Sequence, residues 1–353
     1  MINFFKKLLP NSFKERIFDL VNYLQIAIIN LFKHSSILSS LYYLFFSRMF
    51  DREHKAFLQS KIAYRKYFLN AGVSSPILRR NIHRLEKGLI MRPRKDLFGE
   101  KYIIETVDIY NHAVESGKLN RNEKKWAEDV LNQFFKIVKD SKIISQARDL
   151  FEKSINTSQD NLKFVPYSFD KLPKTNIDYY DLNKLFLKRR SVRWYTSQEV
   201  PIELLNKAVD IASSAPSACN RQPYSFYVSK TKEMAVDIAK LAGGTNGWAE
   251  NIPCTIVVVG DLSAYSSEKD RHIIYIDSSL AAMQLLLTLE TLGLSSCMIN
   301  WADQESAEIK MSKLLDLKPY QRPIMLISVG YANPNGGIPY SQKKKSENLI
   351  KQV

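Results

Sequence analysis

Hydrophobic residues follow two different spacings along this chain, and the change between them falls near residue 181. Between residues 121 and 153 they recur every three or four positions, as at Trp126, Val130 and Phe134. That spacing places them on one face of an α-helix. We therefore expect an amphipathic helix over 121–153, packed on a core, within a mostly helical region that covers 51–153.

Short apolar runs alternate with helix-like segments after residue 181. The preceding residues, 154–180, keep no sustained period and contain two prolines, which is typical of a linker or an irregular arm. Thr255–Val259 is apolar on both faces, so it should be a central strand covered on both sides. Residues 181–353 thus predict a layered α/β or α+β domain. The expected strands are Ser225–Val228, Thr255–Val259, Ser296–Ile299 and Ile324–Val329, and the expected helices are 201–214, 231–241, 273–292 and 304–315.

Residues 1–50 are rich in Phe, Leu, Ile and Tyr, with lysines and arginines between them. Their longest apolar stretch, Leu20–Phe32, contains three amide side chains, so it is shorter and more polar than a membrane-spanning helix requires. It also lacks the apolar core and the cleavage site of a signal peptide. Two interpretations remain. The one we favour is a pair of amphipathic helices packed on the protein or across a dimer; the other is a peripheral contact with an anionic membrane surface.

The charge of the chain is uneven. Its 353 residues contain 51 Lys and Arg against 36 Asp and Glu, a net charge of +15. Residues 1–180 hold 31 basic and 19 acidic residues (+12), whereas residues 181–353 hold 20 and 17 (+3). No RNP, helix-turn-helix or zinc-finger pattern accompanies this charge, so we expect no nucleic-acid partner.

The cysteines and histidines give little support to metal or disulfide chemistry. The three cysteines stand far apart without a CxxC pair, and the five histidines show no HExxH spacing. We therefore expect no metal site and no disulfide framework. Sparse cysteines also fit a reducing compartment, which predicts a cytoplasmic protein, at the inner membrane surface if residues 1–50 bind there.

A first candidate for chemistry is the segment of Arg189, Arg190, Ser191 and Arg193. Guanidinium groups bind phosphate oxygens in pairs and a hydroxyl adds a neutral donor, so this segment is a candidate phosphate clamp. The alternative is a solvated basic stretch at a helix end, where positive charge suits the helix dipole.

A second candidate is the loop SSAPSACNRQPY at residues 213–224. Asn220 and Gln222 each offer a donor and an acceptor, which is what reading the edge of a heteroaromatic ring requires. The alternative is an ordinary loop rich in turn formers.

Together, RRSVRWY at 189–195 and PSACNRQPY at 216–224, followed by a strand, resemble the nitroreductase family of FMN-dependent oxidoreductases. Ile252-Pro253 before the next strand and the ending Val329-Gly330-Tyr331 agree with this resemblance, which covers about residues 181–350. It implies an α+β fold, a three-layer sandwich with a central, mostly antiparallel sheet, here preceded by a mainly α-helical N-terminal region.

The resemblance also implies roles for individual residues. Positions that hold the FMN phosphate and ribityl chain match Arg189, Arg190, Ser191 and Arg193. Positions near the isoalloxazine ring match Pro216, Ser217, Asn220 and Gln222. The backbone segment that faces flavin N5 matches Cys297, Met298 and Ile299, and the candidates for a C-terminal basic residue on the phosphate are Lys343, Lys344 and Lys345. Lysine stands there where arginine is commoner, and Tyr224 replaces the usual tryptophan.

The activity that the resemblance implies is hydride transfer from NADH or NADPH through flavin N5 to a small organic acceptor, nitroaromatic or quinone-like, in ping-pong order. No catalytic side chain is expected, because the cofactor supplies the chemistry. The family forms intertwined homodimers with the flavin at the interface. The alternatives are a specialised dehydrogenase, a flavin-modifying enzyme, or a non-catalytic protein of the same fold at a membrane surface.

One dense polar segment, residues 79–89, lies in the helical half. On a helix, His83 and Lys87 share a face, so they are candidates for a substrate or flavin contact. The alternative, which we favour, is a charged helix face capped by Gly88.

Overall fold

The computed structural model describes residues 11–70, 72–154 and 163–353, and the chain divides into two compact units, Met1–Lys55 and Ala56–Val353. In the first unit, helix α2 (Asn11–Phe32) is followed by α3 (Ser36–Tyr42) and a π-helical turn η1 (Tyr43–Ser47). Aromatic rings gather where α2, α3 and η1 meet: Phe32 and Phe46 lie 5.5 Å apart between ring centroids. The predicted helices of this segment are confirmed, whereas their partner stays a prediction.

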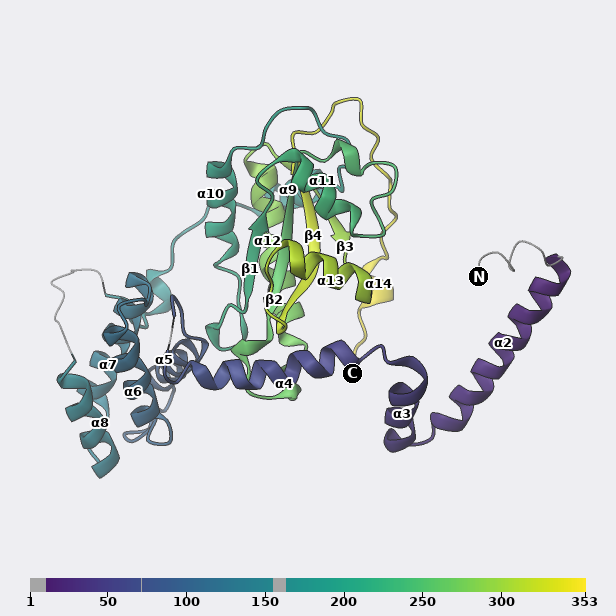
Figure 1. Cartoon of the computed structure of the whole chain (residues 1–353). Coiled ribbons are helices and arrows are strands. Elements are labelled where there is room, and N and C mark those ends of the chain that lie inside the picture. Colours follow the sequence, from purple (N-terminus) through teal and green to yellow (C-terminus); the bar gives the residue numbers. More distant parts are fainter. Residues whose placement is uncertain (1–10, 71, 155–162) are drawn as a thin grey trace. The chain divides into compact units, whose positions relative to one another are not determined.

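The helical part of the second unit has its own hydrophobic core. It consists of the end of α4 (Asp51–Lys66), α5 (Pro76–Leu89), α6 (Ile103–Glu115), α7 (Arg121–Ile137) and α8 (Lys142–Glu152) (Figure 1). Helix α5 begins where the sequence provides a cap: the Ser75 hydroxyl accepts the Leu78 N–H at 3.2 Å and Pro76 occupies the first turn. Fully buried Ile82, Leu85 and Phe134 form the centre of this core.

The single helix expected over 121–153 is wrong, because the chain breaks there into α7 and α8. Val138 has extended backbone angles (φ −70°, ψ 139°), and the Ser141 hydroxyl then caps α8 by accepting the Ile144 N–H at 3.3 Å. The sequence shows the break as a five-residue step between the apolar Val138 and Ile143.

Gly88 does not cap α5 but lies inside it, and the helix ends at Leu89. A side chain on Gly88 would collide with the ring of Phe98. The glycine is therefore needed for close packing against that ring.

The centre of the second unit is a four-stranded, wholly antiparallel sheet with the order β1-β2-β4-β3 (Figure 1). Its strands are β1 (Tyr224–Val228), β2 (Cys254–Asp261), β3 (Ser295–Asn300) and β4 (Gln321–Gly330), and each contains one of the four predicted runs in full. Strand β2 is buried from Cys254 to Gly260, as expected of a central strand.

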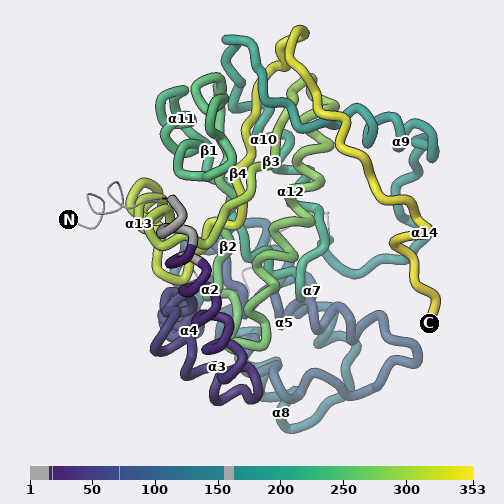
Figure 2. The backbone as a smooth tube through the Cα atoms, turned by 90° about the vertical axis from the view of Figure 1, so that its right-hand side faces the viewer, coloured from purple at the N-terminus to yellow at the C-terminus, as the bar shows by residue number. Residues whose placement is uncertain are grey.

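Helices cover both faces of the sheet, which produces three layers. Alternate residues of β2 point to opposite sides: Ile256 and Val258 pack with one cluster, and Val257 and Val259 with another. The first cluster includes α10 (Ile202–Ala212) and α12 (Ile273–Thr291), and the second includes α11 (Lys232–Lys240) and α13 (Glu305–Leu314). Figure 2 shows α11 and α12 on opposite sides of the strands. The predicted α+β, three-layer fold is confirmed.

Short elements complete the second unit. They are α9 (Tyr179–Lys188), α14 (Ser346–Leu349) and the 3-10 turns η2 (Phe169–Lys171), η3 (Ala218–Asn220), η4 (Ala249–Asn251), η5 (Leu262–Ala264) and η6 (Glu268–Asp270). Of the predicted linker 154–180, residues 155–162 lie outside the described residues.

The expected boundary between 51–153 and the rest of the chain does not separate two bodies, since residues 56–353 form one unit. Phe57 of α4, for example, packs with Leu262 and Ile274.

Within the described residues, one helical stretch, Glu268–Thr291, is long and apolar enough to cross a membrane. Its fully buried residues include Ala281, Leu285 and Leu289, which belong to the core of the three-layer domain. The residues that the structure describes contain no group of three or more His, Cys, Asp or Glu that could hold a metal ion.

Candidate active site

The arginine segment, residues 189–193, lies against the outer side of β3. Helix α9 ends at Lys188, and the next residues run extended beside the strand. Ser191 pairs in parallel with Ser296, and the Val192 N–H donates to the Ser296 carbonyl at 3.0 Å. The arginine segment therefore lies beside the strand that carries Met298 and Ile299.

Tyr195 fastens this segment to the sheet. Its ring is buried, and its hydroxyl lies 2.7 Å from both the Val192 carbonyl and Ser328 Oγ of β4. Burial raises the pKa of Tyr195, so the hydroxyl stays protonated and can donate.

The guanidinium groups of the segment are partly buried and free of carboxylate partners. In the described part of the chain, no salt bridge joins Arg189, Arg190 or Arg193 to an acid. Arg193 instead lies over the ring of Trp248, 5.8 Å from its centroid, and donates to the Ser191 carbonyl at 3.3 Å. Partly desolvated guanidinium groups that form no ion pair with a carboxylate suit a bound anion.

One buried acid lies close enough to feel these charges. Glu290 of α12 is 4% exposed. Burial raises its pKa, an effect that Lys188 and Arg189 partly offset. A carboxyl that holds its proton more readily opposes a neighbouring anion less than a fixed carboxylate would.

Strand β3 is an edge strand, and of its three predicted site residues one is exposed. Met298 is 40% exposed, whereas Cys297 and Ile299 are buried. Burial also raises the pKa of the Cys297 thiol, while Arg193 lowers it less strongly. Among the described residues, no strand pairs with the outer edge of β3 beyond the bridge at Ser296.

The loop of residues 216–222, which we call the amide loop, has an unusual backbone. Cys219, Asn220 and Gln222 all have φ between 51° and 54°, in the left-handed region that non-glycine residues seldom enter. The Gln222 N–H donates to Ser217 Oγ at 3.1 Å, and its side-chain Nε2 donates to the Ser213 carbonyl at 2.6 Å. Such conformations persist only where the surroundings hold them, and they cluster at functional sites.

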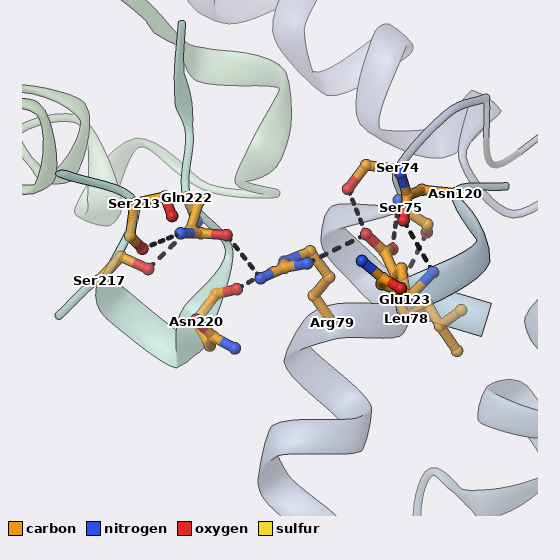
Figure 3. A network of polar contacts seen from close by, with 11 residues as sticks. Ser74, Ser75, Leu78, Arg79, Asn120, Glu123, Ser213, Ser217, Asn220 and Gln222 are labelled. Carbon is orange, nitrogen blue, oxygen red and sulfur yellow. Dashed lines mark hydrogen bonds and ion pairs between the residues drawn. The ribbon is translucent and has the colours of Figure 1, made fainter. Parts of the chain in front are cut away.

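Residues of α12 and α5 also hold the amide loop. Asp277 at the start of α12 accepts the Ala218 N–H at 2.9 Å. Burial raises the pKa of Asp277, and the hydrogen bonds to Ala218 and Tyr265 partly counter that effect. From α5, Arg79 donates to the Asn220 carbonyl and to Gln222 Oε1, each at 2.7 Å (Figure 3).

The Arg79 contact was missed by the sequence reasoning. Its partners lie 141 and 143 residues further along the chain, and no local pattern links them. The dense polar segment 79–89 contains Arg79, but its helical spacing singles out His83 and Lys87 instead.

The arginine segment and the amide loop stand at opposite ends of the sheet. Ser296, beside the arginine segment, is opposite Val329 near the end of β4. Tyr224, which follows the amide loop, is opposite Gly260, and Gly260 is opposite Arg322 at the beginning of β4.

They also stand at opposite edges, because β1 and β3 are the two outer strands (Figure 1). Seven residues of strand correspond to about 23 Å, and three strand spacings to about 14 Å. Within one chain, the two predicted halves of the site therefore do not meet.

The C-terminal lysines are not brought to the arginine segment. The chain after β4 is held near Trp194 by the Asn333 N–H, which donates to the Trp194 carbonyl at 2.9 Å. Lys343 and Lys344 lie further on, exposed, and within the described residues no hydrogen bond or ion pair joins them to residues 189–193.

His83 and Lys87 occupy different settings. His83 Nδ1 lies 3.3 Å from Glu86 Oε2, while Glu86 Oε1 accepts the Trp126 indole N–H at 2.9 Å. His83 therefore belongs to the contact between α5 and α7, and Lys87 is exposed.

Two cavities border the amide loop, and Arg79 lines both. One, of about 520 Å³, lies between α10 and β1, and its lining includes Ser213, Gln222 and Phe226. The other, of about 580 Å³, is lined by Trp126, Phe164 and Asn220, among others.

Comparison with known proteins identifies the domain that carries these features. The model of the nitroreductase family matches residues 186–246 and 238–331. The C-terminal half of the chain is a nitroreductase-family domain. Members of that family are oxidoreductases, and the resemblance of the two motifs is thereby confirmed.

Similar proteins fall into two kinds. A provisionally named NADH dehydrogenase/NAD(P)H nitroreductase of Methanothermobacter thermautotrophicus is 29% identical over 157 residues, which covers 44% of this chain and 80% of that protein. Iodotyrosine deiodinase 1 of Pongo abelii is 22% identical over 283 residues, covering 71% of this chain and 96% of that protein. Among solved structures, a nitroreductase family protein from Streptococcus pneumoniae is 25% identical with a TM-score of 0.42, covering 49% of this chain and all of that one.

Proposed function

We propose that this protein is an FMN-dependent oxidoreductase that uses NADH or NADPH. The observation that carries the proposal is the arginine segment: three partly buried guanidinium groups and a serine hydroxyl lie beside an open strand edge, without a carboxylate partner in the described residues. This donor set fits the phosphate of FMN. Bound FMN would accept a hydride from the reduced nicotinamide and pass it to a small organic acceptor in a separate half-reaction.

The residues of this chain would bind and orient the cofactor. Arg189, Arg190 and Arg193 would hold the phosphate with Ser191, and the outer edge of β3 at Met298 and Ile299 would face the ring. No side chain is required as a general base, because the flavin itself would carry the hydride.

We further propose that the active unit is a homodimer in which each site takes the arginine segment from one chain and the amide loop from the other. The separation of these two segments across the sheet supports this arrangement, since one small cofactor cannot contact both within one chain. Exposed apolar side chains on α9 and α12 support it too, with Phe186 43% and Ile276 53% exposed. Analytical ultracentrifugation of the purified protein would test the dimer.

The test of the cofactor is direct. Purified protein should be yellow and release FMN on denaturation, and Arg189→Gln should weaken FMN binding about tenfold or more, because a hydrogen-bonded charge is removed. Lys184→Gln, one helical turn earlier and exposed, is the control. A colourless protein that cannot be reconstituted with FMN would refute the proposal.

A second candidate is reductive dehalogenation of a halogenated aromatic compound. The alignment with iodotyrosine deiodinase favours it, because it covers 71% of this chain against 44% for the nitroreductase of Methanothermobacter. Anaerobic turnover of the reduced protein with a nitroaromatic, a quinone and iodotyrosine would separate the two, through release of iodide or reduction of the other acceptors.

For residues 1–50 we retain two proposals, packing across the homodimer or contact with an anionic membrane, in a cytoplasmic protein. Tyr23 and Phe45 are 71% and 70% exposed, which leaves apolar surface for either partner. Sedimentation of the full chain with vesicles of anionic lipid, compared with neutral vesicles, would distinguish them.

A further inference from the structure

The amide loop requires an external support. Three of the four residues from Cys219 to Gln222 have positive φ, and none of them is a glycine. The contacts near the loop itself are short-range: the Asn220 N–H donates to the Ser217 carbonyl at 3.0 Å and the Arg221 N–H to the Ala218 carbonyl at 3.4 Å, and Gln222 is tied to Ser213, Ser217 and the Tyr224 N–H. A loop with so many unfavourable backbone angles relaxes unless its surroundings hold it.

Arg79 supplies that support from outside the nitroreductase-family domain. Its Nε donates to the Asn220 carbonyl and its Nη2 to Gln222 Oε1, both at 2.7 Å (Figure 3). One planar guanidinium thus hydrogen-bonds both to the main chain of Asn220 and to the side chain of Gln222. The two contacts together fix both the path of the loop and the direction of the Gln222 amide.

Arg79 is itself held in place. Its Nη1 donates to Glu123 Oε2 at 3.0 Å, and the Arg79 and Glu123 side chains are only 15% and 5% exposed. Glu123 also accepts the Ser74 hydroxyl at 2.7 Å and the Ser75 N–H at 2.9 Å, so it is fixed against the first turn of α5. Helices α5 and α7 therefore together fix the direction of the guanidinium toward the loop.

We propose that the helical region 56–153 is part of the redox site, with Arg79 as the residue that positions the amide loop for the flavin. Glu123 orients Arg79, and Gln222 is the side chain whose direction Arg79 sets. This inference rests on the proposed function as far as the flavin is concerned. The support of the loop by Arg79 does not depend on the proposed function.

The chain offers a matched control on the next residue. Arg80 lies on the same helix and makes an ion pair of the same length, 3.0 Å, with Glu105, but within the described residues no hydrogen bond or ion pair joins it to the amide loop. Arg79→Gln and Arg80→Gln therefore each remove one partly buried ion pair of α5, and only Arg79→Gln removes contacts to the loop. Arg79→Lys keeps the charge but loses the planar fork whose three nitrogens reach Asn220, Gln222 and Glu123 in different directions.

The experiment uses the full chain in two states. In flavin-free protein, hydrogen–deuterium exchange of peptides covering 216–224 should be faster in Arg79→Gln than in the native protein, and unchanged in Arg80→Gln. In protein reconstituted with FMN, Arg79→Gln should raise the dissociation constant of FMN about tenfold or more. The reason is that the loop loses the hydrogen bonds from the Arg79 guanidinium that hold it in position for the flavin. It should also change the flavin absorption spectrum, with Arg79→Lys intermediate.

The outcomes distinguish the support of the loop by Arg79 from the effect of that support on the flavin. Equal loop exchange in Arg79→Gln and Arg80→Gln, with equal FMN affinity, would show that Arg79 is only a structural ion pair and would overturn the inference. Faster exchange with unchanged FMN affinity and spectrum would overturn its role for the flavin. Failure of the native protein to bind FMN would refute the proposed function, while the exchange measurement would still decide whether Arg79 holds the loop.

Discussion

Tyr195→Phe tests whether the arginine segment is fastened to the sheet by one hydroxyl. The substitution keeps the buried ring and its packing and removes only the oxygen. In the native protein that oxygen lies 2.7 Å from the Val192 carbonyl and 2.7 Å from Ser328 Oγ. The side chain is 4% exposed, so water does not readily replace the lost donor.

The expected magnitude follows from these contacts. A net hydrogen bond contributes about 0.5–1.5 kcal/mol, and a buried acceptor left without a donor costs about 1–3 kcal/mol. Loss of the hydroxyl should therefore lower the free energy of unfolding by about 2 kcal/mol. For a domain of this size that corresponds to a Tm lower by about 4–8 °C. Because burial raises the pKa of Tyr195, the effect should be the same at pH 6 and pH 8.

Urea unfolding followed by circular dichroism would measure the change, with Tyr340→Phe as the control. Tyr340 is 85% exposed, and its substitution should alter the free energy of unfolding by less than about 0.5 kcal/mol. If the two variants proved equally stable, the hydroxyl would not fasten the segment and the reasoning would be refuted. The same variant should weaken FMN binding, because residues 189–193 lose their anchor.

Three other substitutions test the domain that carries the site. Gly330→Ala should destabilise it by about 1–3 kcal/mol, because a Cβ there would lie 2.7 Å from the Tyr195 ring. Leu285→Ala, in the fully buried core, should lower the free energy of unfolding by about 2–5 kcal/mol. Asp277→Asn should become more stable relative to the native protein as the pH rises from about 4 toward neutral. Its folded pKa is raised by burial, so the native carboxyl loses its contribution as it ionises.

Each of these has a control in the same unit. Gly337→Ala, where a Cβ meets no atom within 4 Å, should leave thermal stability nearly unchanged, and a similar loss in both glycine variants would contradict the packing argument. Leu314→Ala, at a side chain 42% exposed, should cost much less than Leu285→Ala. Asp316→Asn, at a side chain 95% exposed, is the comparison variant for Asp277→Asn. If the stability of Asp277→Asn changed with pH in parallel with that of the native protein, the raised pKa of Asp277 would be contradicted.

Much of the fold could be predicted because it depends on local pattern. The run Thr255–Val259 is apolar at both faces, and the strand there, Cys254–Asp261, is buried on both sides. Caps at Ser75 and Ser141 mark helix starts that residue type alone suggests. The break before Ser141 is marked in the apolar pattern by a single five-residue step, after which the helical spacing resumes, so periodicity alone favours one continuous helix.

The site could be predicted only in part. The sequence pointed to the arginine segment and the amide loop, since each is a short run of distinctive residue types. It could not show that the sheet holds them apart, because that depends on strand order. Nor could it show Arg79, whose partners come from a loop more than a hundred residues away. The cofactor roles of the arginine segment, the amide loop and the C-terminal lysines all stay predictions.

The position of the arginine segment and the amide loop across one sheet has a consequence for cofactor loading. If each flavin contacts both segments from different chains, then FMN binding and subunit association are linked by mass action. Dilution that dissociates the subunits should then release FMN, and excess FMN should hold the subunits together. Flavin occupancy in this protein would depend on protein concentration as well as on the supply of cofactor.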